Sequence, residues 1–169
     1  SGKKIIKMED LRKLMEDAGY GNVKTYIQSG NVVFEASERS KEKIATAIEK
    51  LIERQYGFEV TVFVIDKQHL EKAIENNPYA EGKAPEESGT KKIYVTFLSE
   101  APSVEAMEKL RQAPIGDDLI ALHEDIMYFK LAMGAADSKL SNNLIESKLK
   151  LKATTRNWNT TLKLLELIS

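Results

Sequence analysis

The sequence predicts an α+β fold made of two tandem ferredoxin-like plaits, each with the element order β-α-β-β-α-β. Runs with strand periodicity and runs with helix periodicity alternate along the chain, and their order repeats in its two halves. A stretch with few apolar residues and two prolines separates these halves. We therefore expect a first plait with a trailing helix over residues 1–77, a linker loop over residues 78–90, and a second plait with a terminal helix over residues 91–169.

The first half begins with an amphipathic helix and continues with a hairpin, because the Ser29-Gly30 pair separates two β-prone runs. Residues 58–65 are apolar at both alternating positions, so we expect a strand that is covered on both faces. In order, the elements expected here are a helix from Met8 that ends at Gly19, strands over 23–28 and 31–36, a helix over 41–56 capped by Ser40, a strand over 58–65, and a short helix that Asp66 caps.

The second half contains a complete β-α-β-β-α-β unit followed by a helix. Its expected elements are a strand over 91–98, a helix capped by Ser103, hairpin strands over 118–123 and 126–131, a helix over 139–149, a strand over 151–155, and a helix over 157–168. The first half lacks the opening strand of this pattern. We therefore expect the first plait to miss its N-terminal strand, the chain to be a fragment, and the helices to cover one face of each sheet.

Composition excludes several classes of protein. With 42% hydrophobic and 30% charged residues, the chain is neither disordered nor embedded in a membrane. The longest mostly apolar run has six residues, against roughly 20 for a membrane-spanning helix, and no export leader opens the chain. We expect a cytoplasmic protein with no membrane partner. Cysteine is absent and only two histidines occur, which excludes disulfides, thiolate sites and multi-histidine metal centres.

Known catalytic and cofactor motifs are missing from the sequence. It contains no phosphate-binding loop, dinucleotide fingerprint, zinc-protease motif, nucleophile elbow or calcium loop, so we predict no cofactor and no metal site. We interpret His69 and His123 as surface residues, and the acids Glu81, Glu86 and Glu87 as part of a solvated linker.

Two polar clusters stand out at opposite ends of the chain. The first contains Gln28, Ser29 and Asn31 at the tip of the hairpin. The second contains Thr155, Arg156 and Asn157 at the start of the last helix, where an arginine beside a helix N-terminus is suited to bind an anion. The structural alternative is turn formation and helix capping, with a buried Trp158 as the anchor of the second cluster.

Charge is distributed unevenly along the chain. Residues 1–24 and 138–169 carry net charges of +2 and +4, whereas the 113 residues between them carry −7. The total of −1 argues against a general polyanion binder. If the two ends lie together, they form a basic patch beside an acidic body.

The strings YIQSGNVVF and TTRNWNT, together with residues 4–36, 138–140 and 153–167, resemble the bacterial family catalogued as domain of unknown function 1697. The resemblance covers nearly the whole chain and implies tandem ferredoxin-like plaits whose first strand precedes the segment that opens here. It adds Ser138 and Lys139 to the candidate site. Members often carry a glycine near Lys150, at the end of the helix before ATTRNW. The resemblance implies no activity.

Three functions of different classes compete. The favoured one is binding of a small anionic or nucleotide-like ligand at the joint of the two plaits, with Arg156 facing a concave surface shared with the hairpin tip. The alternative is a module that binds single-stranded nucleic acid by stacking on Tyr94, Phe97 or Tyr128. The third is an enzyme that uses Arg156 as an electrophilic clamp, so enzymatic activity stays open. The sequence does not decide the oligomeric state.

Overall fold

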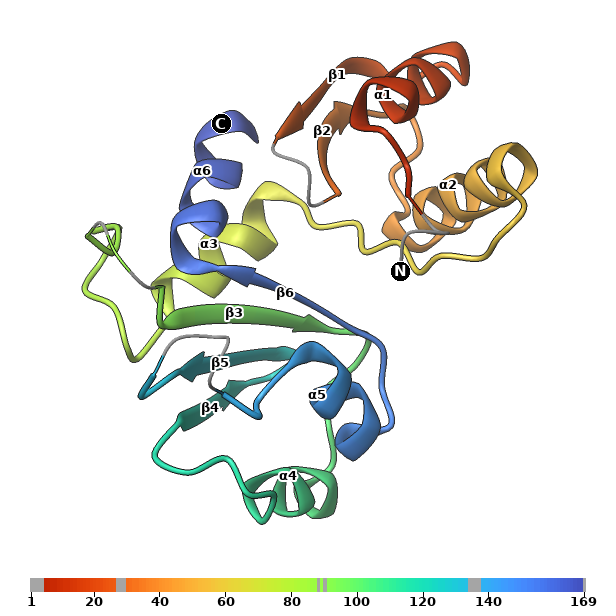
Figure 1. Cartoon of the computed structure of the whole chain (residues 1–169). Coiled ribbons are helices and arrows are strands. Elements are labelled where there is room, and N and C mark those ends of the chain that lie inside the picture. The colour runs from red at the N-terminus through yellow and green to blue at the C-terminus, as the bar shows by residue number, and fades with distance from the viewer. Residues whose placement is uncertain (1–4, 27–29, 88, 90, 134–137, 169) are drawn as a thin grey trace. The chain divides into compact units, whose positions relative to one another are not determined.

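The computed structural model describes residues 5–26, 30–87, 89, 91–133 and 138–168. It is a mixed α/β structure in which the described residues form two β-sheets and six helices. Figure 1 labels these elements. The chain divides into two compact units: unit 1 comprises Ser1–Asp66 with Glu166–Ser169, and unit 2 comprises Lys67–Leu165.

Unit 1 contains a two-stranded antiparallel sheet and two helices. These elements are α1 (Met8–Asp17), β1 (Gly21–Tyr26), β2 (Asn31–Glu35) and α2 (Lys41–Tyr56). Tyr26 pairs with Asn31 across the hairpin, which confirms the expected β-hairpin. Gly30, next to β2, has a φ of 79°, a conformation that strains residues with a Cβ atom. Ser40 caps α2 as expected, because its hydroxyl accepts from the Lys43 amide at 3.2 Å.

The expected strand over residues 58–65 is wrong, because this segment belongs to neither sheet that the described residues form. The alternation that predicts it is present: Val60, Val62 and Val64 pack against the core of unit 1. The Val62 amide, however, donates to the Glu49 carboxylate on α2 at 2.8 Å. A strand requires a neighbour for its backbone groups, and periodicity alone does not provide one.

Unit 2 contains a four-stranded sheet. Its elements are α3 (Lys67–Glu75), β3 (Ile93–Leu98), α4 (Val104–Arg111), β4 (Leu119–His123), β5 (Ile126–Lys130), α5 (Asn142–Leu149), β6 (Ala153–Asn157) and most of α6 (Trp158–Ile168). The strand order is β4-β5-β3-β6, and every neighbouring pair is antiparallel. The hairpin expected on either side of Glu124-Asp125 is therefore confirmed.

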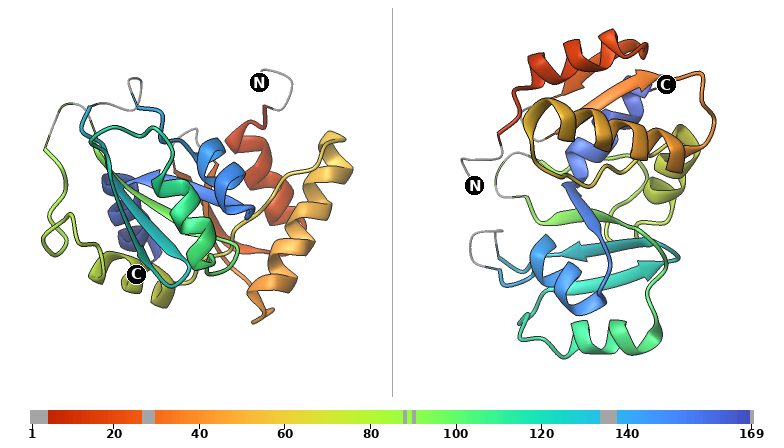
Figure 2. Two further views of the ribbon diagram at one scale, coloured as in Figure 1. Left: turned by 90° about the horizontal axis from the view of Figure 1, so that it is seen from below. Right: turned by 90° about the vertical axis from the view of Figure 1, so that its right-hand side faces the viewer.

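Helices cover both faces of the sheet in unit 2, so the expectation of helices on one face only is wrong for this unit. Figures 1 and 2 show α4 and α5 on one side of the sheet and α3 and α6 on the other. The first face packs Met127 and Phe129 against α4 and α5. On the second face, Tyr128 is fully buried and its hydroxyl donates to the Ala73 carbonyl of α3 at 2.5 Å. Both faces of β3 carry buried side chains, which is why each needs a cover.

Helix α3 packs on the sheet of unit 2, although the order of elements in the sequence predicts that residues 67–75 belong to the first half. Its Ala73 carbonyl lies in the last turn, where carbonyls lack a partner within the helix. The Tyr128 hydroxyl supplies that partner, and burial raises the pKa of Tyr128. None of the helices in the described part of the chain is long and apolar enough to cross a membrane.

Candidate functional site

The first predicted cluster lies at the hairpin of unit 1. Gln28 and Ser29 fall outside the described residues. Asn31 begins β2, has 5% of its surface exposed, and donates from Nδ2 to the Tyr26 carbonyl at 3.3 Å. This bond joins the two ends of the hairpin, so Asn31 performs the turn function that the sequence analysis gives as the alternative.

Ser138 and Lys139 lie in the segment before α5. The Ser138 hydroxyl donates to the Asp118 carboxylate at 2.5 Å and accepts from the Leu140 amide at 3.0 Å. The other oxygen of Asp118 accepts from the Ala132 amide at 2.7 Å. Ser138 thus helps to fasten this segment to the start of β4. Lys139 is exposed.

Thr155 and Asn157 have structural partners within unit 2. The Thr155 hydroxyl donates to the Asn142 side chain of α5 at 2.8 Å and lies 2.8 Å from the hydroxyl of the fully buried Thr96. The Asn157 side chain accepts from the Thr160 amide at 2.8 Å, which is the N-cap arrangement expected for α6.

Arg156 projects from β6 toward the face opposite Thr155, because successive residues of a strand point to opposite faces. The side chain is half-buried. Its Nη1 donates to the Thr154 hydroxyl at 2.8 Å and to the Thr155 carbonyl at 2.9 Å. Burial lowers the pKa of the Arg156 guanidinium, since removal from water disfavours the charged form.

The predicted residues of unit 2 do not form one cluster. Thr155 belongs to the network on the α5 side, whereas Arg156 belongs to the opposite face. Ser138 contacts Asp118 just before β4, and strands β5 and β3 lie between β4 and β6 in the sheet. Of the two cations in the predicted set, Arg156 is half-buried and Lys139 is exposed, so Arg156 is the better candidate for ligand chemistry.

Trp158 is completely buried, which confirms its expected role as an anchor. Its Nε1 donates to the Ala84 carbonyl at 2.8 Å. The next residue, Asn159, exchanges two bonds with the backbone of Glu86, at 2.8 and 3.0 Å. The Glu86 carboxylate also accepts from the amides of Lys92 and Ile93, both at 3.1 Å. The interpretation of Glu86 as a solvated linker residue is therefore wrong.

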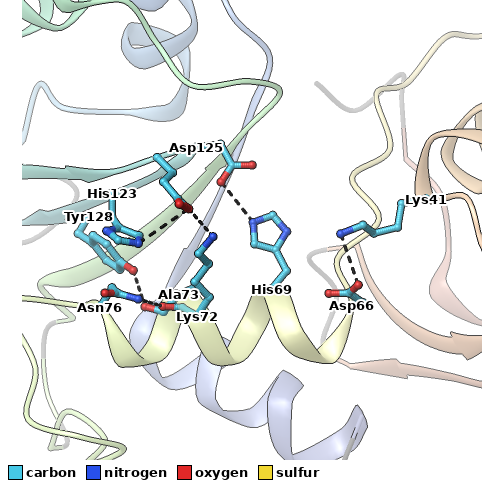
Figure 3. A network of polar contacts seen from close by, with 10 residues as sticks. Lys41, Asp66, His69, Lys72, Ala73, Asn76, His123, Asp125 and Tyr128 are labelled. Carbon is cyan, nitrogen blue, oxygen red and sulfur yellow. Dashed lines mark hydrogen bonds and ion pairs between the residues drawn. The ribbon is translucent and has the colours of Figure 1, made fainter.

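A polar network between α3 and the β4–β5 turn was not predicted from the sequence, and Figure 3 shows it. His69 Nε2 lies 3.5 Å from the Asp125 carboxylate, and Lys72 forms an ion pair with Glu124. His123 Nε2 lies 3.9 Å from the same Glu124 carboxylate. The hydrogen bond between Lys72 and Glu124 lowers the pKa of the Glu124 carboxyl and raises the pKa of the Lys72 ammonium.

Both histidines of the chain therefore belong to one network, although 54 positions separate them in the sequence. In the sequence, the tripeptide His123-Glu124-Asp125 at a tight turn is the local signal for this network. His69 joins the network because α3 packs against this turn, which the sequence does not indicate. The His69 ring also lies edge-on to Phe97, with ring centroids 5.3 Å apart. Among the described residues, no group of three or more histidine or acidic side chains has the arrangement of a metal site.

The aromatic residues of unit 2 are poorly placed to stack on nucleic acid bases. Tyr128 and Phe97 have 0% and 4% of their surfaces exposed, beneath the face that α3 and α6 cover. Tyr94 stacks on Phe129, with ring centroids 5.0 Å apart, on the opposite face. Nucleic-acid binding by a plait requires an open sheet with accessible aromatic rings. The geometry of this unit does not favour that mode.

A family model described as "Protein of unknown function (DUF1697)" matches residues 1–128. The chain belongs to the DUF1697 family. The matched residues include the hairpin of unit 1, both histidines and β4. They end before Ser138 and Arg156, so the ATTRNW string lies beyond the family match although the resemblance also relies on it. The description of the family assigns no activity to the chain.

A solved bacterial structure has a similar fold. It is described as "conserved bacterial protein SP0830 from Streptococcus pneumoniae", and it has 18% sequence identity and a TM-score of 0.66 with this chain. The similarity covers 99% of this chain and 91% of the other. At this identity the likeness establishes the fold and no function. No curated protein matches the sequence.

Proposed function

We propose that the protein binds a small anionic ligand, a phosphate or carboxylate compound, through Arg156. The observation that carries this proposal is the half-buried guanidinium, whose pKa burial lowers. Such a cation is poorly solvated, and a bound anion would offset that cost. Nη1 donates hydrogen bonds to a hydroxyl and to a carbonyl, and these bonds orient the guanidinium.

The position of Arg156 in the chain also supports an anion. It lies two residues before α6, whose N-terminal end carries partial positive charge. Guanidinium groups bind carboxylate and phosphate oxygens through two parallel hydrogen bonds. Thr155 and Asn157 then act as supports that hold this part of β6 in place. Roles for Gln28, Ser29, Asn31, Ser138 and Lys139 in ligand binding stay predictions.

A thermal-shift screen tests this function. The probes are inorganic phosphate, pyrophosphate, adenosine monophosphate, a sugar phosphate and citrate. A ligand at 100 times its dissociation constant stabilises a protein by about 2.7 kcal/mol, so a true ligand raises Tm measurably. We expect at least one probe to stabilise the wild-type protein and to lose this effect in Arg156→Ala.

Arg54→Ala is the matched control, because Arg54 is exposed on α2 and its removal changes the net charge equally. Since Arg156 is half-buried, we expect its replacement to reduce the free energy of unfolding by about 1–3 kcal/mol, more than expected for an exposed arginine. Equal ligand-induced shifts in the wild type and Arg156→Ala would contradict the proposal. Binding of single-stranded RNA with a steep salt dependence would favour the nucleic-acid alternative.

We also infer that the two units share the β-α-β-β-α-β plan of tandem ferredoxin-like plaits. Support comes from unit 2, in which the strand that ends the plan, β6, pairs with the strand that opens it, β3. The proposal also includes a cytoplasmic location, and the linker loop over residues 78–90 stays a prediction.

A further inference from the structure

Strand β4 forms one outer edge of the sheet in unit 2. In an antiparallel pair, alternate residues of an edge strand turn their N–H and C=O groups away from the partner strand. Ile120 belongs to this outward set, because its carbonyl accepts from Arg111 Nη1 on α4 at 3.2 Å. Leu122, two residues farther along, shares the same direction. These backbone groups are able to pair with another strand.

The opposite edge of the sheet is strand β6, and more of its backbone groups are hydrogen-bonded to side chains. On β6, the Ala153 amide donates to the Glu146 carboxylate at 2.8 Å, and the Ala153 carbonyl accepts from Asn142 at 3.0 Å. The Thr155 carbonyl accepts from Arg156 at 2.9 Å. On the outer side of β4, the bond from Arg111 is the one side-chain hydrogen bond to the backbone in the described structure.

The side chains of β4 do not prevent pairing with another strand. Its sequence, Leu-Ile-Ala-Leu-His, contains no lysine, arginine, acid or proline, the residues that usually protect an exposed edge. Leu119 has 51% of its surface exposed. Arg111 therefore stands alone as the charged residue that occupies this edge among the described residues.

We propose that the outer edge of β4 is a self-association surface for β4 of a second copy of this chain, and that Arg111 holds it closed. An antiparallel two-fold pairing centred on Ile120 places Ile120 opposite its own equivalent and Leu119 opposite Ala121. The same register places Asp117 opposite His123 on both sides of the axis, an acid against a residue that becomes cationic when protonated.

This register pairs Leu119, Ile120 and Ala121 with one another across the axis and opposes Asp117 to His123. The register centred on the next residue, Ala121, instead opposes Asp118 to Glu124 and Asp117 to Asp125, and these pairs of acids repel each other. In the favoured register the Ile120 carbonyl accepts from the Ile120 amide of the second copy. The bond from Arg111 to this carbonyl must therefore break in both copies before the sheets join.

Sedimentation equilibrium over a range of protein concentrations tests the proposal. Replacement of Arg111 by Ala removes the competing bond from each copy, so we expect the dimer dissociation constant to fall roughly tenfold or more. Lys109→Ala is the matched control: Lys109 is exposed in the last turn of the same helix, and its removal changes the charge equally. Addition of Leu119→Lys to Arg111→Ala should restore the monomer, because a lysine blocks edge pairing.

Several results would overturn the proposal. They are an unchanged dissociation constant in folded Arg111→Ala, an equal fall in Lys109→Ala, and open-ended aggregation in place of a discrete dimer. If the alanine variant does not fold, Arg111→Met replaces it, because methionine keeps an aliphatic side chain on α4 but cannot form the bond to Ile120. The same fall in the dimer dissociation constant is expected for it. Retention of the dimer after Leu119→Lys would place the contact on another surface and would also refute the role of β4.

Discussion

Lys150 adopts a left-handed backbone conformation, with φ of 58° and ψ of 38°, at the C-terminal end of α5. Its amide donates to the Glu146 carbonyl at 2.9 Å, which completes the last turn. A left-handed conformation costs a residue with a Cβ atom about 1–2 kcal/mol, whereas glycine adopts it freely. The glycine that the family resemblance implies near this position therefore has a physical explanation, and the lysine here retains the conformation at a cost.

Replacement of Lys150 by glycine should increase stability. We expect the free energy of unfolding, measured by urea denaturation, to rise by about 0.5–1 kcal/mol, because relief of backbone strain exceeds the entropy that glycine adds to the unfolded chain. Lys150→Ala is the control, since alanine loses the charge but keeps the strain. An equal gain in both variants would show that the lysine side chain, and not its backbone, is unfavourable.

The connection from α3 to β3 is fixed by α6. Trp158 and Asn159, at the start of α6, bond to the backbone of residues 84 and 86. Glu86 in turn binds the amides at the start of β3 through its carboxylate. A helix that begins 60 residues after the end of β3 thus holds the segment that leads into that strand.

Glu86 and Glu87 should therefore differ sharply when each is replaced by alanine. We expect Glu86→Ala to lower the free energy of unfolding by about 1–3 kcal/mol, because two backbone amides lose a charged acceptor. Glu87→Ala, at an exposed neighbour, should change it by less than about 0.5 kcal/mol. Urea denaturation measures both. Similar values for the two variants would contradict the role of the Glu86 carboxylate.

At the level of elements, features that depend on neighbours in sequence were predictable. Ser40 and Asn157 cap their helices through an amide three residues ahead, so the sequence contains both partners. The strand expected over residues 58–65 is absent from both sheets of the described structure, because the periodicity that predicts a strand does not provide a neighbouring strand. Glu86 was missed for a related reason: its partner Asn159 lies 73 residues away, beyond any local pattern.

At the scale of the whole molecule, the candidate site too was predictable only where it depends on neighbours in the sequence. Arg156 was identified from its place before a helix, which is local information. Its half-burial and its bond to the Thr155 carbonyl follow from the position of β6 at the sheet edge. The network of His69 and His123 requires α3 to pack on the sheet, which sequence spacing does not reveal.

The two units differ in how completely they are built. Among the described residues, the core cluster of unit 1 contains six buried residues around a two-stranded sheet, whereas the larger cluster of unit 2 contains ten against a four-stranded sheet. A two-stranded hairpin is marginal without further strands, and buried apolar area provides most of the stabilisation. We therefore expect unit 1 to unfold at a lower urea concentration than unit 2.

Two spectroscopic signals separate these events. Trp158 is the single tryptophan of the chain and is buried in unit 2, so its fluorescence reports on that unit. Far-ultraviolet circular dichroism reports on the helices of both units, including α1 and α2. The circular dichroism transition should begin before the fluorescence transition, and amides of β1 and β2 should exchange hydrogen faster than those of β3 and β5. Coincident transitions would mean that the stability of unit 1 is coupled to that of unit 2 despite its smaller core.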